Sequence, residues 1–367
     1  MKHYDIAAYV WPAYTGDEPR SLPFWPEGIG EWQTLKKQVV KKDGYFWNRQ
    51  PLWGYENEAD PKVMEKQIRE ALSHGVNVFI YDWYWYDDRP FLENCLNDGF
   101  LKAENNTQMK FFIMWANHDA TTLWDMRLAG SPYTTIWQGK VTRSQFEAIG
   151  KRWIRQYFKK DNYYRIDNKP VVSIYDIKNL ISGLGGPRQT VDALRWLNEE
   201  CQREGLDGVH LQFIRWDGKI QNMSGVDGSA LENEGELVKE LGFDSVTNYQ
   251  FVHMTNMNRE YSEAVEDVKR LWDEIATEYS VPYYPHVSVG WDNNPRFLHF
   301  RDNISKNNTP EEFKKSLLYA KDFCDKTGVN LITVNSWNEW TETSYLQPDN
   351  LYGYGYLNAI KEVFGEK

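Results

Sequence analysis

The sequence predicts an α/β protein: a single (β/α)8 barrel of the TIM type with enlarged loops after its strands, in one domain over residues 1–367. Two observations predict this fold. Apolar, β-prone runs alternate with amphipathic stretches along the chain, and runs that are apolar throughout are typical of parallel strands buried on both faces. The length also exceeds a typical barrel by roughly 100 residues, which leaves room for long loops.

The expected strands are spread over the whole sequence. They cover residues 6–11, 76–83, 109–115, 170–175, 209–215, 245–249, 286–289 and 331–336. Helix signals separate them: Asp60-Pro61 opens a helix that stops at Gly75, and Thr309-Pro310 opens one that stops at Gly328. A doubly wound sheet is the competing architecture, but neither G-x-G-x-x-G nor G-x-x-x-x-G-K-[ST] occurs in the chain.

Composition excludes several classes of protein. The formal net charge is −11, so the average surface repels a nucleic-acid backbone. Mean hydropathy is −0.69, and no apolar run approaches the roughly 18 residues that a membrane span requires. Aromatic residues make up 16 % of the chain. Because Trp and Tyr carry polar atoms that need partners, we expect some of these rings to line a cleft.

The cysteines and the N-terminus give weaker indications. Cys95, Cys201 and Cys324 lie far apart, without the spacing of a zinc site or a disulfide framework, and are expected to be buried free thiols. No metal or cofactor is expected. The N-terminus lacks the pattern of a secretory signal, so the protein is either cytoplasmic or has had an export signal removed.

Aromatic and polar residues gather where each expected strand ends, which is where a barrel places its active site. They are Trp11 and Tyr14; Asp82-Trp83-Tyr84-Trp85; Trp115, Asn117, His118 and Asp119; Tyr175-Asp176; Arg215-Trp216-Asp217; Asn248-Tyr249-Gln250; Trp291-Asp292-Asn293; and the segment 337–342. A pyranose offers a CH-rich face to aromatic rings and hydroxyls to carboxylates and amides. The residues predicted to bind substrate are Tyr9, Trp11, Tyr14, Asp82, Trp83, Trp115, Asn117, His118, Tyr249, Trp291 and Asn338.

Two carboxylates follow the last expected strand. Glu339 and Glu342 are three residues apart, so a helical turn would bring them to one side, about 5 to 6 Å apart. Two acids in an aromatic cleft cannot both ionise freely, so the pKa of one of them should rise. Cleavage of a glycosidic bond needs one acid and one base of this kind. The alternative is a pair of acids that stabilises the start of a helix.

The segment Ser336-Trp337-Asn338-Glu339-Trp340-Thr341-Glu342 resembles the Asn-Glu-Trp-x-Glu signature of glycoside hydrolase family 99 and its WbsX-like relatives. The resemblance extends over most of the chain, in the family's order. The other similar blocks are Ala8-Tyr9-Val10-Trp11-Pro12, Glu31-Trp32, Tyr81-Asp82-Trp83-Tyr84-Trp85, Trp115-Ala116-Asn117, Gly290-Trp291-Asp292-Asn293, Leu346-Gln347-Pro348-Asp349 and Tyr352-Gly353-Tyr354-Gly355-Tyr356-Leu357.

The resemblance implies a metal-independent, retaining glycosidase that acts on α-mannoside-type bonds within a glycan. It implies that Glu339 deprotonates the substrate's own 2-hydroxyl, which attacks the anomeric carbon to form a 1,2-anhydro sugar. Glu342 would protonate the leaving oxygen and later activate water. Three positions depart from the family pattern: Thr343 replaces a common Gly, Gln347 replaces a Glu, and His118 stands where WbsX-like members usually have Glu.

Two other functions remain open at this stage. WbsX-like relatives have been named glycosyltransferases, although such enzymes usually bind a nucleotide diphosphate through a metal with an Asp-x-Asp motif or through a basic loop, and this chain has no Asp-x-Asp. A barrel that binds carbohydrate without catalysis is the third possibility. In all three cases the expected partner is an oligosaccharide or polysaccharide.

Overall fold

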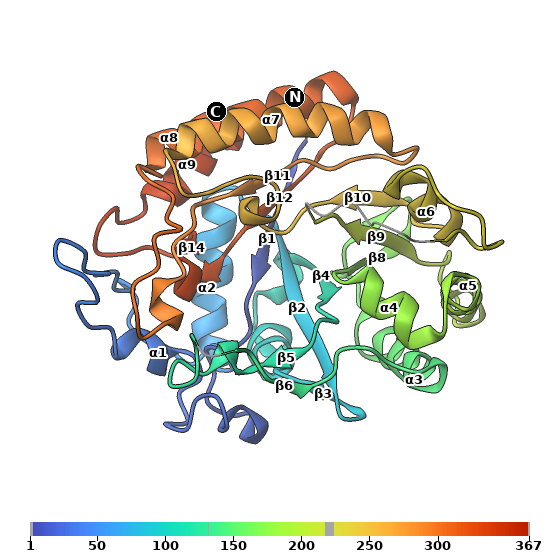
Figure 1. The fold of residues 1–367 in the computed structure, drawn as a ribbon, viewed down its shortest axis with the longest axis horizontal. Helices are drawn as coiled ribbons and strands as arrows, with labels where there is room; N and C mark the ends of the chain where they lie inside the picture. Colours follow the sequence, from blue (N-terminus) through green and yellow to red (C-terminus); the bar gives the residue numbers. More distant parts are fainter. Residues whose placement is uncertain (1–2, 131, 217–223, 366–367) are drawn as a thin grey trace.

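Eight parallel strands form the centre of the molecule in the computed structural model, which describes residues 3–130, 132–216 and 224–365 (Figure 1). Their order in the sheet follows their order in the chain. They are β1 (Asp5–Val10), β2 (Val78–Tyr86), β4 (Lys110–Trp115), β8 (Lys169–Ile174), β9 (His210–Ile214), β10 (Ser245–Thr247), β11 (His286–Ser288) and β12 (Leu331–Asn335). Each overlaps an expected strand, so the eight predicted runs and the (β/α)8 class are confirmed.

The barrel closes between β10 and the segment that enters β11. A parallel bridge pairs Val246 with Tyr283, and Val246 N donates to Pro282 O at 3.0 Å. The interior also contains polar side chains with partners of their own. Thr247 Oγ1 lies 2.9 Å from Thr333 Oγ1, which is in turn 2.9 Å from Nδ1 of the fully buried His286. Buried polar groups therefore pair across the barrel, as burial requires.

Helices surround the strands. They are α1 (Trp32–Lys36), α2 (Pro61–Ser73), α3 (Arg143–Trp153), α4 (Ile177–Leu184), α5 (Pro187–Arg203), α6 (Glu234–Leu241), α7 (Tyr261–Glu278), α8 (Pro310–Thr327) and α9 (Gly355–Phe364). Two start as the sequence indicates, because Asp60 accepts from Lys62 N and Thr309 accepts from Glu312 N. After β2 the connection contains short π and 3₁₀ turns over Cys95–Gly99 and Phe100–Lys102 instead of an α-helix.

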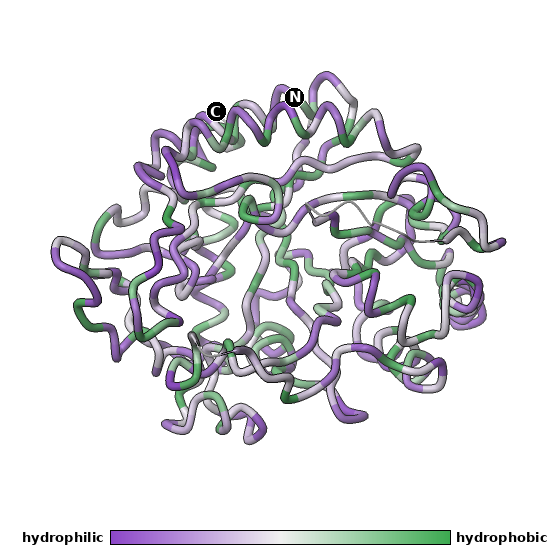
Figure 2. Tube along the Cα trace, viewed as in Figure 1, coloured by the Kyte–Doolittle hydropathy of each residue, from purple (hydrophilic) through white to green (hydrophobic). Residues whose placement is uncertain are grey.

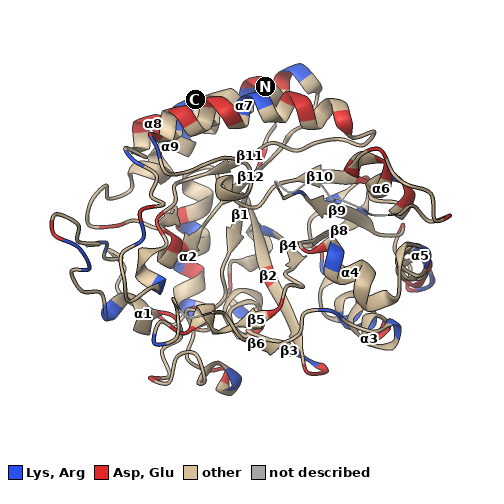
Figure 3. Cartoon of the chain, viewed as in Figure 1, with Lys and Arg blue, Asp and Glu red and all other residues tan. Residues whose placement is uncertain are grey.

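The outer and inner layers differ in chemistry. Hydrophilic and hydrophobic residues alternate along the outer helices in Figure 2, as expected when one face of a helix packs on the barrel. Charged residues are frequent along helices such as α7 and α8, while most of the ribbon of the central strands is tan in Figure 3. The three cysteines are buried, as expected.

Additional short strands decorate the loops. They are β3 (Arg89–Phe91), β5 (Ala120–Thr121), β6 (Thr135–Trp137), β7 (Arg165–Ile166), β13 (Asn338–Glu339) and β14 (Ser344–Tyr345). The pairs β5–β6 and β13–β14 are antiparallel hairpins. Both follow the carboxyl ends of barrel strands, so they confirm the enlarged loops. No helix among the described residues is long and apolar enough to cross a membrane.

Candidate active site

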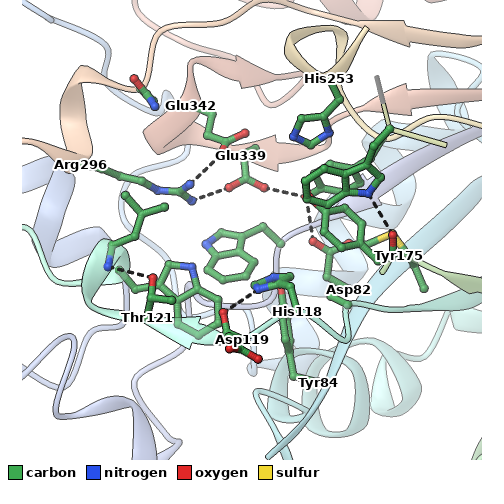
Figure 4. A pocket seen from close by; sticks show the side chains of 18 of the residues that line it. Asp82, Tyr84, His118, Asp119, Thr121, Tyr175, His253, Arg296, Glu339 and Glu342 are labelled. Carbon is green, nitrogen blue, oxygen red and sulfur yellow. Dashed lines mark hydrogen bonds and ion pairs between the residues drawn. The ribbon is translucent and has the colours of Figure 1, made fainter. Parts of the chain in front are cut away.

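A cavity of about 330 Å³ opens at the carboxyl ends of the barrel strands (Figure 4). Aromatic rings, carboxylates and one guanidinium make up most of its wall. The described residues that line it are Trp11, Asp82, Tyr84, Met114, Ala116, His118, Asp119, Thr121, Leu123, Trp124, Tyr175, Trp216, Tyr249, His253, Trp291, Asn293, Arg296, Glu339 and Glu342. The position matches that of active sites in (β/α)8 barrels.

Strand β2 places a carboxylate in this wall. Successive residues of a strand point to opposite faces, so Asp82 and Tyr84 line the cavity while Trp83 between them does not. Asp82 is 4 % exposed; its Oδ2 lies 2.9 Å from the Tyr249 hydroxyl, and its Oδ1 has no hydrogen-bond partner within the described part of the chain. Burial raises the pKa of Asp82 well above its usual value, which favours the neutral carboxyl.

Two glutamates reach the cavity from the segment after β12. Glu339 ends β13, and a 3₁₀ turn over Trp340–Glu342 brings Glu342 to the same side. Arg296 Nη2 donates to Glu339 Oε1 at 2.6 Å, and Arg296 Nη1 donates to Glu342 Oε1 at 2.6 Å (Figure 4). The two carboxylates therefore share one guanidinium.

A third carboxylate completes the arrangement around Arg296. Arg296 lies in a 3₁₀ turn over Asn294–Arg296, in the loop after β11. Its Nε donates to Oε1 of the fully buried Glu31 at 3.3 Å, and Oε2 of Glu31 accepts from Trp11 Nε1 at 2.6 Å. Three acidic side chains thus surround one cation that cannot lose its proton.

This surplus of acids determines how the site titrates. Burial raises the pKa of Glu339 well above its usual value, and the neighbouring Glu342 raises it further, while Arg296 lowers it. Burial likewise raises the pKa of Glu342, against the lowering effect of Arg296. Because one cation cannot balance all the carboxylates, the pair tends to retain a proton. The arrangement can therefore supply one acid and one base.

Seven of the residues expected from the sequence lie together in the cavity wall: Trp11, Asp82, His118, Tyr249, Trp291, Glu339 and Glu342. His118 Nδ1 is 2.9 Å from Asp119 O, and burial lowers the pKa of His118, so its ring is a neutral hydrogen-bonding group.

Trp83 and Trp115, which the sequence predicts to bind substrate, do not line the cavity. Both side chains face away from it, which corrects the prediction of their position. Trp83 Nε1 donates to Glu93 Oε1 at 2.7 Å. The rings of Trp83 and Trp115 pack against Trp153 of α3, at centroid distances of 5.4 and 5.6 Å. The physical reason is strand alternation: each tryptophan follows an inward-facing residue, Asp82 or Met114.

Tyr9 and Tyr14 also lie outside the cavity wall. The Tyr9 hydroxyl donates to the backbone oxygen of Asn248 at 3.0 Å, and its ring lies 4.8 Å from that of Tyr249, which it supports. Tyr14 packs on Trp32 at a ring distance of 4.0 Å. Both rings are fully buried, so neither is available for contact with a sugar.

Asn117 and Asn338 are structural rather than lining residues. Asn117 Oδ1 accepts from Asp176 N at 2.7 Å, and Asn117 Nδ2 donates to Asp176 O at 2.7 Å, which fixes two loops to each other. Asn338 brackets Trp11 in the same way, accepting from its N at 2.8 Å and donating to its O at 2.9 Å. A side-chain amide can both donate and accept a hydrogen bond, so it can hold the N and O of one backbone residue. The position of Asn117 or Asn338 after a strand does not distinguish this structural role from contact with a substrate.

Several residues that line the cavity are not among those predicted from the sequence to bind substrate. Tyr84 lies near the end of β2, and Tyr175 and Trp216 come just after β8 and β9, so the ends of strands are a signal that could have indicated all three. Asp217, next to Trp216, lies outside the described residues. Trp124 and Arg296 come from turns deep within long loops, and no local pattern marks them. His253 is stacked on Trp216 with a centroid distance of 4.5 Å.

Three polar atoms of the wall have no hydrogen-bond partner among the residues that the structure describes. Asp82 Oδ1 and Asn293 Oδ1 are acceptors, and Trp291 Nε1 is a donor; all three are buried. Unpaired buried polar groups carry an energetic penalty, which a ligand relieves by supplying the missing hydrogen bonds. A hydroxyl group, which both donates and accepts, fits either kind of atom. Among the described residues, no group of three or more His, Cys, Asp or Glu could hold a metal ion.

The family described as Glycosyltransferase WbsX matches residues 6–360. The chain belongs to the WbsX family. The curated relatives include the uncharacterized protein WxcX of Xanthomonas campestris pv. campestris, strains B100 and ATCC 33913, each 23 % identical over 368 residues. The alignment covers 94 % of this chain and 47 % of each relative, so the chain spans about half the length of those proteins.

Solved structures share the fold. The GH99 endo-alpha-mannosidase from Bacteroides thetaiotaomicron is 14 % identical, with a TM-score of 0.61 over 98 % of this WbsX-family chain and 95 % of that one. The same enzyme in complex with bis-tris-propane gives a TM-score of 0.62 at 14 % identity and the same coverage. A protein described as glycoside hydrolase-like is also 14 % identical, with a TM-score of 0.62 over 100 % of this chain and 95 % of its own.

Proposed function

We propose that this WbsX-family protein is a glycoside hydrolase that cleaves an α-linked, mannoside-type glycan with retention of configuration. The observation that carries the proposal is the pair Glu339 and Glu342, held 2.6 Å from one guanidinium at the wall of an aromatic cavity. The raised pKa of each carboxyl and their shared cation support a division into one acid and one base. The proposal requires no metal or cofactor.

The proposed reaction proceeds in two steps without a covalent bond to the enzyme. First, Glu339 takes the proton of the substrate's 2-hydroxyl, and that oxygen attacks the anomeric carbon. The bond to the leaving oxygen breaks, and Glu342 protonates that oxygen. In the second step Glu342 takes a proton from water, which attacks the anomeric carbon and opens the 1,2-anhydro ring. The 2-oxygen recovers its proton from Glu339, so both carboxyl groups return to their starting state.

The hydrogen bonds around the pair support this assignment of roles. Glu339 Oε2 is 3.2 Å from the Tyr249 hydroxyl, in addition to the contact of Oε1 with Arg296. The single proton of this hydroxyl is available to Glu339 when the neutral Asp82 carboxyl donates its own proton to the tyrosine oxygen. Donors to a carboxylate favour its ionised form, so Glu339 suits the base. Glu342 contacts Arg296 without a second donor among the described side chains, which suits the acid.

Two features of the cavity support a glycan of several units that is attacked internally. The unpaired atoms of Asp82, Trp291 and Asn293 offer places for sugar hydroxyls. Trp216 also lines the cavity with 37 % of its surface exposed, and its ring is fixed flat against His253. An exposed, rigid indole of this kind is a platform for a second pyranose.

The family's name raises glycosyl transfer as the alternative. A sugar nucleotide brings a diphosphate, which needs positive charge in its site. Among the described lining residues Arg296 is the one guanidinium or ammonium group, and all three of its nitrogens already contact carboxylates. A diphosphate would therefore face acidic groups, and hydrolysis is the function that the charge distribution favours.

The test is to incubate the protein with α-mannans and with neutral oligosaccharides, and to follow product size and anomeric configuration by NMR. We expect shorter products that first appear with the α configuration. Glu339→Gln and Glu342→Gln should each lower kcat by about 10² to 10⁴, the range for general acid and base groups.

The matched control is Glu234→Gln. Glu234 is also a buried acid, at 8 % exposure, but it contacts Tyr279 and Arg215 and does not line the cavity. We expect its kcat to stay within about twofold of the wild type. Glycan binding without products in the wild type would indicate a non-catalytic barrel. Thermal stabilisation by sugar nucleotides and not by oligosaccharides would indicate a transferase.

A further inference from the structure

Glu58 is a carboxylate that the proposed reaction does not use. It lies in the loop between β1 and α2, is fully buried and does not line the cavity. Three side-chain amides donate to it. Gln347 Nε2 and Gln67 Nε2 donate to Oε1 at 2.9 and 3.1 Å, and Asn338 Nδ2 donates to Oε2 at 2.8 Å.

Two of these amides also accept hydrogen bonds from tryptophans of segment 336–342, which carries Glu339 and Glu342. Gln67 Oε1 accepts from Trp337 Nε1 at 2.7 Å, and Gln347 Oε1 accepts from Trp340 Nε1 at 2.7 Å. The third, Asn338, belongs to the segment itself. The residues on both sides of Glu339 are therefore linked to a single carboxylate, directly or through one amide.

A second route runs from Glu58 to the cavity through Trp11. Asn338 holds the backbone of Trp11 at both its N and its O. Trp11 in turn donates to Glu31, which contacts Arg296, the partner of Glu339 and Glu342. Both the backbone that carries Glu339 and the cation that faces it thus depend on contacts that begin at Glu58.

The chemistry of Glu58 suits this task. An ionised carboxylate only accepts hydrogen bonds, so three converging N–H donors satisfy it without conflict. A glutamine would turn its NH₂ group toward one of these donors. The amides cannot simply reverse, because the oxygens of Gln67, Gln347 and Asn338 already accept from Trp337, Trp340 and Trp11.

We infer that Glu58 is a positioning residue for the proposed active site, and that it fixes segment 337–340 so that Glu339 meets the substrate in reactive geometry. This inference rests on the proposed hydrolase function. Small displacements of a reacting group are costly: about 1 Å can lower a rate by about 10².

The experiment compares Glu58→Gln with Glu234→Gln, the buried acid outside the cavity. We expect both variants to fold and to lower Tm. On the α-mannan that the wild type hydrolyses, Glu58→Gln should lower kcat at least tenfold while KM changes less than threefold. Glu234→Gln should keep kcat within twofold. An unchanged kcat in Glu58→Gln, or an equal loss in both variants, would overturn the inference.

A crystal structure of Glu58→Gln separates this inference from the proposed function, because it needs no turnover. We expect the Arg296 Nη2 to Glu339 Oε1 distance to lengthen from 2.6 Å by at least about 0.5 Å. An unmoved Glu339 contradicts positioning even if the wild type is a hydrolase; a displaced Glu339 supports it even if no hydrolysis is found.

If Glu58→Gln does not fold, Gln347→Met tests one link alone. It preserves the side-chain volume and removes the amide between Glu58 and Trp340. We expect kcat to fall about threefold to tenfold with KM unchanged. A variant that folds with the kcat of the wild type would count against the inference.

Discussion

Arg296 determines the charge state of the candidate site more than any other residue. Its three nitrogens contact Glu31, Glu339 and Glu342, so three of its five N–H groups are engaged and acidic side chains surround the cation. The pair Glu339 and Glu342 could be predicted from spacing and position after a strand. Arg296 could not, because it lies in a loop whose path brings it back over the cavity, and only the tertiary structure specifies that path.

Thr343 is a departure from the family pattern that the structure explains. Its φ of 55° lies in the left-handed region, where glycine is favoured and a β-branched side chain is strained. The hydroxyl offsets this strain, because Thr343 Oγ1 donates to Asp292 O at 2.7 Å and accepts from Trp47 Nε1 at 2.8 Å. The threonine hydroxyl therefore connects Trp47 to the loop that carries Asp292, through two hydrogen bonds that a glycine could not make.

Trp216 supports a prediction about substrate length. Its Nε1 donates to Tyr175 O at 2.9 Å and its ring stacks on His253, so the platform is rigid before a ligand arrives. We expect Trp216→Ala to raise KM for a mannotetraose about tenfold, which corresponds to the loss of roughly 1.4 kcal/mol of stacking. A short aryl α-mannoside, which does not reach the platform, should keep its KM. Steady-state kinetics on both substrates measures the difference.

The control for this substitution is Tyr133→Ala. Tyr133 is 48 % exposed and does not line the cavity. The substitution therefore removes an exposed aromatic ring at a distance from the proposed site. We expect no change for either substrate. An equal rise in KM for the long and the short substrate in Trp216→Ala would show that Trp216 is not a platform for a second unit.

At the level of elements, β2 shows which part of the site a sequence can and cannot indicate. Its position and its apolar character were predictable, and so was Asp82 at the cavity. Trp83, which ends the expected strand 76–83, is predicted to bind substrate as well, but alternation along β2 turns its side chain toward Glu93 and α3. In a strand that is buried on both faces, burial does not distinguish the inner face, and only the register with the neighbouring strands does.

This alternation gives a paired prediction within β2. Asp82→Asn changes an unpaired acceptor of the cavity and should lower kcat/KM on α-mannan about tenfold. Trp83→Phe removes the hydrogen bond to Glu93 on the opposite face. It should lower the free energy of unfolding by about 1 kcal/mol and leave kcat/KM within about twofold. Kinetics and urea denaturation of the two variants provide the measurement.

Adjacent residues serve here as controls for each other, since both are buried in the same strand. A large loss of kcat/KM in Trp83→Phe would contradict the orientation of β2. Unchanged kinetics in Asp82→Asn would remove Asp82 from the proposed contacts with sugar hydroxyls.

For the whole molecule, the sequence predicts the barrel well, but it does not predict which buried acids have raised pKa values. Apolar runs reveal the strands because burial on both faces leaves a continuous signal. Isolated buried acids leave none: Glu58 and Glu234 are surrounded by residues distant in sequence, such as Asn338 and Tyr279. Burial raises the pKa of each to about 7. These two groups therefore link the stability of the folded protein to pH.

The direction of this linkage follows from the two pKa values. In the unfolded chain each carboxyl has a pKa near 4.5, and in the folded protein near 7, so the folded state holds more protons between these values. Stability contributed by each group is therefore highest below about pH 4.5 and is lost as the pH rises to about 7. The free energy of unfolding that Glu58 contributes should change by about 3 kcal/mol over this range, and that of the partly exposed Glu234 by less.

Glutamine at either position removes the titration, so each variant should lose less stability than the wild type between pH 5 and pH 8. Glu58→Gln should be the less stable protein at pH 5, because its NH₂ group brings two N–H donors toward the amides of Asn338, Gln67 and Gln347, where the protonated Glu58 brings only one O–H. By pH 8 the gap should narrow or reverse, since only the wild type must then ionise a buried acid. Urea denaturation at both pH values measures the difference in the free energy of unfolding between the wild type and Glu58→Gln. If this difference is the same at pH 5 and pH 8, Glu58 titrates near its ordinary pKa, and its amide donors outweigh its burial.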